Sequence, residues 1–311
     1  MPIRRRDFLS ASLAALTGSL MARTPAPGTE GLALGKAAPE AFGDHPGRTV
    51  TVQQVIDALQ ADVPGAPFAD TVDTIKCGDP STPVRGIVTT MFPTDEIIQK
   101  AIDLGANFII PHEPTFFSGG DNVQWLADDP VYKYKRGLLE KNGIVIWRFH
   151  DGLHAHQPDG VRMGVIQAVG WEPYFSAGDP SLINLPSAAS LADLIALFKK
   201  SLGIEHVKYI GDLAQPCSRI VVCPGAYNGR TQMNLIQQYR PELFICGEIR
   251  EWETNQYVLD ARYSGQKISL LILGHSLSEE PGLEWLRTQL KIKFPEVPVT
   301  HLPSGDPFQW E

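Results

Sequence analysis

Short apolar runs alternate with segments of helical spacing along the chain from residue 51 onward. Apolar runs at 84–90, 107–110 and 144–149 have the length and the β-branched content of buried strands. Segments 52–59, 94–104 and 131–141 carry apolar residues at helical spacing, and the last two end at Gly105 and Gly143. The succession of strand, helix, strand, helix, strand predicts a parallel α/β sheet.

The same alternation recurs in the second half. The pattern predicts strands at 219–223, 243–246, 268–273 and 297–302, and helices at 189–202, 231–239, 253–263 and 282–290. The stretch 171–190 is rich in Pro, Ser and Gly, which is typical of a connection. We therefore expect an α/β fold with two lobes, about 49–170 and 190–311, built on mostly parallel sheets.

The first 48 residues have a different pattern. Arg5-Arg6, one spacer and Phe8-Leu9 precede a mildly apolar run that ends in a Pro-rich segment. This resembles a twin-arginine export signal over 1–26, followed by a Gly-, Pro- and Ala-rich linker over 27–48. A short basic amphipathic helix docked on the domain is the alternative. The export signal predicts a periplasmic or other extracytoplasmic protein, with no membrane attachment once the signal is removed.

The amino-acid composition argues against several classes of protein. The 311 residues are 43% hydrophobic, which fits a globular protein rather than a disordered chain. Twenty-seven basic against 35 acidic residues give a net charge of −8, so binding to a nucleic-acid backbone is not expected. The four cysteines form no CxxC pair, and this argues against a zinc ribbon or a disulfide framework. No apolar run reaches the ~18 residues that a membrane span needs.

Histidines and carboxylates follow four of the predicted strands. In chain order they are His112 and Glu113, then His150, Asp151 and His154, then Glu248, and finally His275 and Glu279. In parallel α/β sheets, ligand sites lie at the carboxyl ends of strands, so these side chains are expected to meet. Imidazole with carboxylate is the donor set of zinc, iron, manganese and cobalt. Ser278 as the N-cap and Pro281 in the first turn predict a helix that starts at Glu279, with His275 in the loop just before it.

Other chemistries have weaker signals. His154-x-His156 has the spacing of a metal pair in a barrel hydrolase, but the other motifs of that class are missing. A serine hydrolase would need a G-x-S-x-G turn, which the sequence lacks. The turn at 224–229 before a helix has the form of a phosphate cradle, although it is more often only a strand-to-helix turn.

The motifs resemble the NIF-three-like dinuclear-metal-centre proteins, some of which are described as GTP cyclohydrolase type-two enzymes. The resemblance covers about 51–307. The run from Arg85 to Pro114 is similar to the family's strand-helix-strand that leads into His-His-Pro. His150-Asp-Gly-Leu-His154 resembles its His-Thr-Asn-Leu-Asp, and Gly274-His275-Ser-Leu-Ser-Glu279 resembles its Gly-His-Tyr-x-(Ser/Thr)-Glu. The resemblance implies two α/β domains and a ring-shaped homo-oligomer, a hexamer.

The resemblance also implies a ligand set for two divalent ions, which we expect to be zinc, iron or manganese. The family's ligands are His, His, Asp, His and Glu, and the matching residues here are His112, Glu113, His154, His275 and Glu279. Two exchanges keep the inventory at three imidazoles and two carboxylates. We expect Glu279 to bridge the ions, with His112 and Glu113 on one ion and His154 and His275 on the other.

The leading hypothesis is an exported metal-dependent hydrolase with a small-molecule substrate, phosphoester or nucleotide-like. Glu248 is the candidate general acid or base because it follows a strand without being needed as a ligand. Asp151 and His150 are expected to orient the ligands, and Asp151 is also an alternative to His154 as a ligand. A non-enzymatic metal-binding or assembly protein, or a scaffold that has lost its metal, would share the same ligands.

Overall fold

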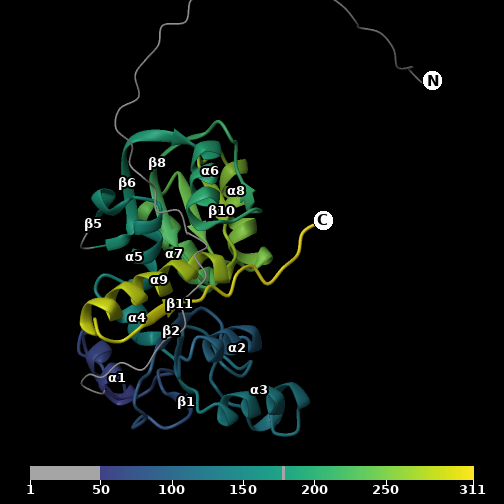
Figure 1. Ribbon diagram of the computed structural model, residues 1–311. Coiled ribbons are helices and arrows are strands. Elements are labelled where there is room, and N and C mark those ends of the chain that lie inside the picture. The colour runs from purple at the N-terminus through teal and green to yellow at the C-terminus, as the bar shows by residue number, and fades with distance from the viewer. Residues whose placement is uncertain (1–49, 177–178) are drawn as a thin grey trace, which may run out of the picture. The chain divides into compact units, whose positions relative to one another are not determined.

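The computed structural model describes residues 50–176 and 179–311, in which strands and helices alternate around two β-sheets (Figure 1). This confirms the α/β class predicted from the sequence. The twin-arginine signal predicted at 1–26 and the linker predicted at 27–48 lie outside the described residues. Within the described residues, each helix is too short or too polar to cross a bilayer.

The first sheet has five strands in the order β1-β4-β3-β2-β11. Their bounds are β1 Ile75–Cys77, β2 Ile87–Thr90, β3 Phe108–Pro111, β4 Val145–Trp147 and β11 Val299–His301. The four strands β4, β3, β2 and β11 run parallel, and only β1 at the edge is antiparallel to its neighbour. The last strand of the chain thus completes the sheet that the first half begins, a pairing that the hydrophobic pattern did not indicate.

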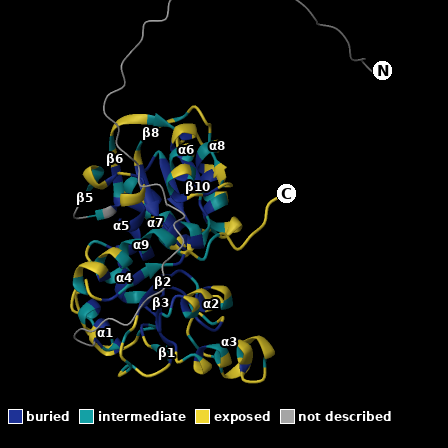
Figure 2. Cartoon of the chain, viewed as in Figure 1, coloured by how far each residue is buried: buried dark blue, intermediate teal, exposed yellow. Residues whose placement is uncertain are grey.

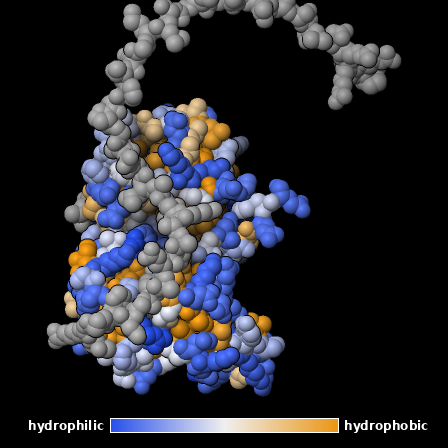
Figure 3. Space-filling view, viewed as in Figure 1, coloured by the Kyte–Doolittle hydropathy of each residue, from blue (hydrophilic) through white to orange (hydrophobic). Residues whose placement is uncertain are grey.

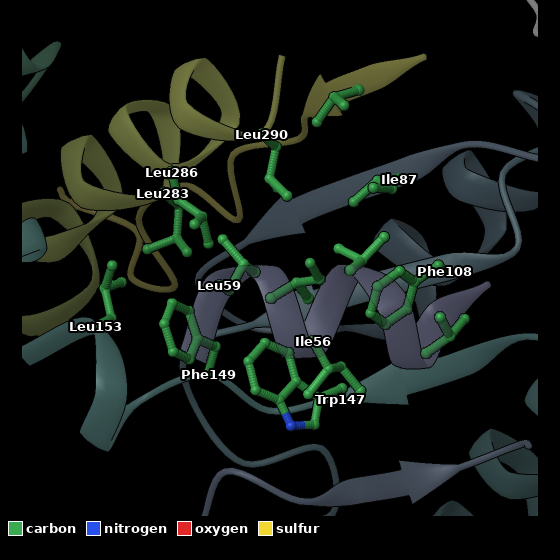
Figure 4. Packing of buried hydrophobic residues seen from close by; sticks show 14 of the residues in the cluster. Ile56, Leu59, Ile87, Phe108, Trp147, Phe149, Leu153, Leu283, Leu286 and Leu290 are labelled. Atoms are coloured by element: carbon green, nitrogen blue, oxygen red, sulfur yellow. The ribbon is translucent and has the colours of Figure 1, made fainter. Parts of the chain in front are cut away.

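Both faces of this sheet are buried, which explains why its strands are continuous apolar runs. Ile87 and Phe108 point to one face, and their neighbours Val88 and Ile109 point to the other, because successive side chains of a strand alternate. On the first face they pack with Trp147, helix α1 (Val52–Gln60) and leucines of α9 (His275–Lys293) (Figure 4). The second face packs against α2 (Asp95–Asp103) and α3 (Pro130–Lys141), which a 3-10 turn, η1 (Gln124–Leu126), precedes.

Capping residues set where these helices begin. The Thr51 hydroxyl accepts from the backbone of Gln54, whose side chain accepts from Thr51 in return, so α1 starts with a capping box. Thr94 caps α2, and Asp129 caps α3 directly before Pro130 at the first helical position. The starts of α2 and α3 predicted from the sequence therefore agree with the structure to within one residue.

The second sheet has six strands in the order β5-β6-β8-β9-β10-β7 and is parallel at its centre, β8-β9-β10. Its strands are β5 Phe175–Ser176, β6 Asp179–Ser190, β7 Lys208–Ile210, β8 Pro216–Cys223, β9 Leu243–Cys246 and β10 Ser269–Ile272. The helical segments of this half are η2 Glu172–Tyr174, α6 Leu191–Leu202, α7 Gly229–Tyr239, the π-helix η3 Glu251–Asn255 and α8 Gln256–Tyr263. As in the first sheet, alternate residues such as Val221 and Val222 enter different cores. Figure 2 shows how far each part of the chain is buried.

The prediction that 171–190 is a connection was wrong, because this stretch forms the β5-β6 hairpin. Pro and Ser are typical of loops, so the composition of this stretch did not indicate a strand. Strand β6 pairs antiparallel with β8 and carries an irregularity between Asn184 and Ala189, and Pro186 lies inside that irregularity. Proline is tolerated in strands at bulges and edges, where no ladder N–H is required.

Helices α5 (Gly160–Ala168) and α9 pack so closely that glycine is needed on both. A Cβ on Gly164 would collide with the backbone of Pro281, and one on Gly282 would lie 2.6 Å from the Cα of Val161. Figure 1 shows α9 beside α5 and also beside β2 and β11. Helix α9 therefore has a fixed position against both α5 and the first sheet.

The surface mixes polar and apolar side chains on the face that Figure 3 draws. Trp252, Tyr263 and Phe308 are among the large side chains that are exposed. Single apolar residues at a surface are ordinary for a folded protein. Exposed residues of this kind do not test an assembly, so the hexamer implied by the family resemblance stays a prediction.

Candidate metal centre

His112 and Glu113 lie directly after β3, where the backbone is still held by its neighbours. The His112 N–H donates to the Thr90 carbonyl at 3.1 Å, and the Glu113 N–H donates to the Met91 carbonyl at 3.0 Å. Both residues are buried, and the His112 side chain has no exposed surface. The end of a central parallel strand therefore carries two adjacent donors in fixed directions.

His154 lies on the short helix α4 (Asp151–Ala155), which follows β4, and His150 is the residue directly before the helix. No side chain of α4 caps its start. Instead the carboxylate of Asp73, 77 to 79 residues earlier, accepts from the backbone N–H groups of His150, Asp151 and Gly152 at 2.7, 2.9 and 2.6 Å. These groups are the unpaired donors of a helix N-terminus, so Asp73 acts as a cap from a distant segment. The cap sets the direction in which both imidazoles point.

His275 and Glu279 lie on the first turns of α9. The prediction that Ser278 caps this helix was wrong, because the helix begins at His275, after Gly274 at φ +92°, and Pro281 lies inside it. The Ser278 hydroxyl donates to the His275 carbonyl and accepts from the Gly225 N–H, so it does not cap a helix. With His275 helical, the two ligand candidates are four residues apart on one helix face and their side chains meet at 3.0 Å.

The structure brings all five predicted ligands together around the Glu279 carboxylate. His112 Nε2 is 3.6 Å from its Oε2, His154 Nε2 is 3.8 Å from its Oε1, and His275 Nε2 is 3.0 Å from its Oε2. Glu113 Oε1 is 3.3 Å from His275 Nε2. The donor atoms of His112, Glu113 and Glu279 lie within 4.8 Å of one another.

This arrangement fits a divalent ion. Two donors bound at ~2.1 Å in a tetrahedral arrangement are about 3.4 Å apart, which is close to the separations of 3.0 to 3.8 Å measured here. In addition, His112 Nε2 is completely buried and has no hydrogen-bond partner among the described residues. A buried polar atom without a partner costs free energy, and an ion beside it would remove that cost. Gly225 also approaches the Glu279 carboxylate so closely that a Cβ would collide with it.

The charges of the centre divide its histidines into two kinds. Burial, together with the neighbouring rings of His154 and His150, lowers the pKa of His112 well below its usual value, which favours its neutral imidazole. Burial also acts to lower the pKa of His275, but its hydrogen bonds with Glu113 and Glu279 prevail and raise it to about 10. The protonated His275 therefore balances the two carboxylates in the way that a bound cation would.

Glu113 is tied to a chain of buried charges. Burial acts to raise the pKa of its carboxyl, but the contacts with His275, His150 and Arg148 lower it overall. Arg148, 3% exposed, donates from Nη2 to Glu113 Oε2 at 3.1 Å and from Nη1 to Asp121 at 3.3 Å. Because Arg148 occupies Oε2, the other oxygen of Glu113 is the one that faces the histidines.

The remaining predicted residues lie at the edge of the cluster. Glu248 follows β9 and its side chain is half exposed, with Oε1 3.8 Å from His275 Nδ1. Asp151 turns away from the donors, because its Oδ2 accepts from Thr71 and from the Val72 N–H and its Oδ1 contacts His150 Nδ1. It therefore lies in the position of a residue that orients His150.

Sequence reasoning missed four residues that shape this centre: Asp73, Arg148, Asp159 and Gly225. Arg148 had a visible signal, because a charged residue interrupts an apolar run that predicts a buried strand. Asp159 contacts His154 Nδ1 at 3.3 Å and also caps α5. Gly225 was interpreted as part of a strand-to-helix turn or a phosphate cradle, and not as a neighbour of Glu279. Asp73 had no local signal, since its partners lie far along the chain.

Comparison with known proteins points to the same family as the sequence motifs. The family model of Duf34/NIF3 (NGG1p interacting factor 3) matches residues 50–307. A "GTP cyclohydrolase 1 type 2 homolog" of Clostridium perfringens is 25% identical over 225 residues, which cover 70% of this chain and 80% of the relative. A protein of the same name from Chlamydia pneumoniae is 26% identical over 246 residues, 75% of this chain and 90% of the relative.

Solved structures show the same fold. A hypothetical protein of Staphylococcus aureus superposes with a TM-score of 0.70 at 20% identity, covering 85% of this chain and 100% of that one. A Bacillus cereus protein related to NIF3 superposes with a TM-score of 0.69 at 14% identity, with the same coverage. The family model spans most of the chain, and its range includes the residues that build the centre. The chain therefore belongs to the Duf34/NIF3 family.

Proposed function

We propose that this protein is a metal-dependent hydrolase with a dinuclear site. The observation that carries the proposal is the buried, unpartnered Nε2 of His112, which faces the Glu279 carboxylate at 3.6 Å. His112, Glu113, His154, His275 and Glu279 would hold the ions, which we expect to be zinc, iron or manganese. Three imidazoles with two carboxylates are a suitable donor set for such ions.

The side chains around the donors would supply the rest of the chemistry. Bound divalent ions act as Lewis acids that make a water molecule more acidic and stabilise a developing negative charge. Glu248 is half exposed and 3.8 Å from His275, so its carboxylate is free to accept a proton from the nucleophile and return it to the leaving group. Arg148 and Asp159 hold Glu113 and His154 in place through hydrogen bonds.

A phosphoester or nucleotide-like small molecule is the proposed substrate class. Two relatives that cover most of this chain carry the name "GTP cyclohydrolase 1 type 2 homolog", which supports a substrate of this kind. Developing charge on phosphoryl or purine oxygens is also the charge that a pair of cations stabilises best.

Export by the twin-arginine route and assembly into a hexamer are further parts of the proposal. Export rests on Arg5, Arg6 and the Phe8-Leu9 pair, and hexamer formation rests on the family. Cell fractionation with Arg5→Lys/Arg6→Lys as the matched variant tests export, because an exported protein would stay in the cytoplasm when the pair is changed. Analytical ultracentrifugation of the purified protein tests the assembly.

The activity test uses purified protein with a measured metal content. We expect turnover on a panel of phosphoesters and cyclic amidines, loss of turnover after chelation, and a fall of at least tenfold in kcat for Glu248→Gln. Glu251→Gln is the matched control, since Glu251 is exposed on the nearby π-helix and lies outside the donor cluster. A protein that binds metal but turns over nothing on a broad panel would be a metal-binding protein without hydrolase activity.

A further inference from the structure

Three imidazole rings form a compact group on one side of the centre. The donor atoms of His112, His150 and His154 lie within 4.8 Å of one another. The ring of His150 stacks on that of His112 at 4.5 Å between centroids, and His154 meets both edge-on at 5.0 Å. His150 Nε2 is 3.9 Å from Glu113 Oε1, so this nitrogen points toward the donors rather than toward solvent.

Each of these rings is oriented through its other nitrogen. The Nδ1 partners of His112, His150 and His154 are, in that order, the Phe149 carbonyl at 3.1 Å, Asp151 Oδ1 at 3.0 Å and Asp159 Oδ2 at 3.3 Å. A carbonyl or carboxylate oxygen only accepts, so Nδ1 donates to it and Nε2 is the nitrogen left to face an ion. A histidine held by an oxygen at one nitrogen and free at the other is the usual arrangement of a metal ligand.

The other three donors of the centre have a different chemistry. Glu113 Oε1 and Glu279 Oε2 lie 3.3 and 3.0 Å from His275 Nε2. Glu279 also faces His112 and His154 at 3.6 and 3.8 Å, so its carboxylate lies next to both groups of donors. Two carboxylates and one imidazole make this second group rich in oxygen. The group of three histidines, by contrast, offers only nitrogen donors. Nitrogen donors favour zinc, nickel and cobalt, whereas carboxylates suit manganese and magnesium.

We propose that the centre consists of two unlike subsites that select different divalent ions. An imidazole subsite of His112, His150 and His154 takes a nitrogen-preferring ion such as Zn²⁺. A carboxylate subsite of Glu113, Glu279 and His275 takes an oxygen-preferring ion such as Mn²⁺. The inference rests on the proposed dinuclear function, and it adds His150 as a ligand and a class of ion for each position.

The test measures metal binding instead of turnover. Purified full-length protein is stripped of metal and then given Zn²⁺ and Mn²⁺ together in excess. Elemental analysis after gel filtration is expected to find one equivalent of each ion per chain. The electron paramagnetic resonance spectrum is expected to show isolated Mn²⁺ without the splitting of a manganese pair. Titration calorimetry then gives the affinity for each ion separately.

Paired variants assign the subsites. His150→Gln is expected to weaken Zn²⁺ binding by at least about tenfold and to leave Mn²⁺ binding unchanged, whereas Glu113→Gln is expected to do the reverse. His206→Gln is the control, because His206 is exposed and lies outside both subsites. Circular dichroism verifies that each variant is folded. The mixed-ion measurement on the unaltered chain tests the proposal even where a variant fails to fold.

Two results would overturn the inference in different ways. Two equivalents of Zn²⁺ in the mixed-ion experiment, with His150→Gln binding Zn²⁺ normally, would refute the unlike subsites and leave the dinuclear hydrolase intact. A protein that binds neither ion would refute the dinuclear site as well.

Discussion

Arg148 provides the most direct test of how the centre is held together. Its guanidinium is 3% exposed and donates to Glu113 Oε2, to Asp121 Oδ2 and to the carbonyls of His112 and Gly119, at 2.7 to 3.3 Å. Replacing Arg148 by Met keeps the apolar stem but removes all of these donors. The carboxylate of Glu113 then stays buried without its guanidinium partner, and only its Oε1 contact with His275 at 3.3 Å and the longer one with His150 at 3.9 Å remain.

The size of the expected stability loss follows from the burial of this ion pair. Removing one partner of a buried ion pair costs about 3–5 kcal/mol, because the remaining charge is left without compensation. We expect Arg148→Met to lower the free energy of unfolding by that amount. With a urea m-value of about 2 kcal/mol/M, the midpoint would fall by roughly 2 M. Asp121 would be less affected, because Lys76 Nζ also contacts it at 2.5 Å.

Urea unfolding followed by circular dichroism measures this loss, and two comparisons isolate its cause. Lys100→Met removes an exposed partner of Glu96 and is expected to cost less than about 0.5 kcal/mol. Arg148→Met combined with Glu113→Gln removes both buried charges and is expected to recover at least about 1.5 kcal/mol. A loss below about 1 kcal/mol for Arg148→Met, or no recovery in the double variant, would refute the reasoning.

Three further predictions concern other parts of the structure. Burial lowers the pKa of Lys135 to about 8, so the unfolded chain binds more protons between pH 8 and 10.5. Stability should therefore gain up to about 3 kcal/mol from this group as the pH rises through that range, and urea unfolding of Lys135→Met should lack this gain. Gly225→Ala would place a Cβ against the Glu279 carboxylate at φ +78° and should weaken Mn²⁺ binding at least tenfold by calorimetry, whereas an unchanged affinity would mean that the carboxylate moves freely. Asp73→Ala removes the distant cap of α4 and should cost about 1–3 kcal/mol in urea unfolding, whereas an unchanged midpoint would mean that water replaces the cap.

Much of the fold could be predicted because strands that are buried on both faces of a parallel sheet have continuous apolar sequences. The strands after Gly86, Asn107 and Gly143 are of this kind, and their helices begin at Thr or Asp caps. Strand β6 could not be found in this way, because its stability comes from pairing with β8 rather than from its own residues. Local patterns reveal local preferences, and the hydrogen-bonding partner of an irregular strand is not a local property.

The candidate site was predictable in its residues but less so in its geometry. The position of His112 and Glu113 after a strand gave their location, since strand ends of parallel sheets converge. The direction of the His150 ring was not predictable, because Asp73 and Asp151 set it and Asp73 is 77 residues away. His275 was predicted to lie in a loop because Ser278 and Pro281 have the residue types that usually mark the start of a helix. The Ser278 hydroxyl instead bonds the backbone of Gly225, a contact that only the folded chain creates.

The pairing of β11 with β2 has a consequence for biosynthesis. Thr89 and His301 meet across this pair although 212 residues separate them, and α9, directly before β11, carries Glu279. A ribosome that has released only the first half of the chain therefore exposes an unfinished sheet edge and an incomplete donor set. The donor set is complete only when the residues from His275 onward have left the ribosome and α9 has folded onto the first sheet.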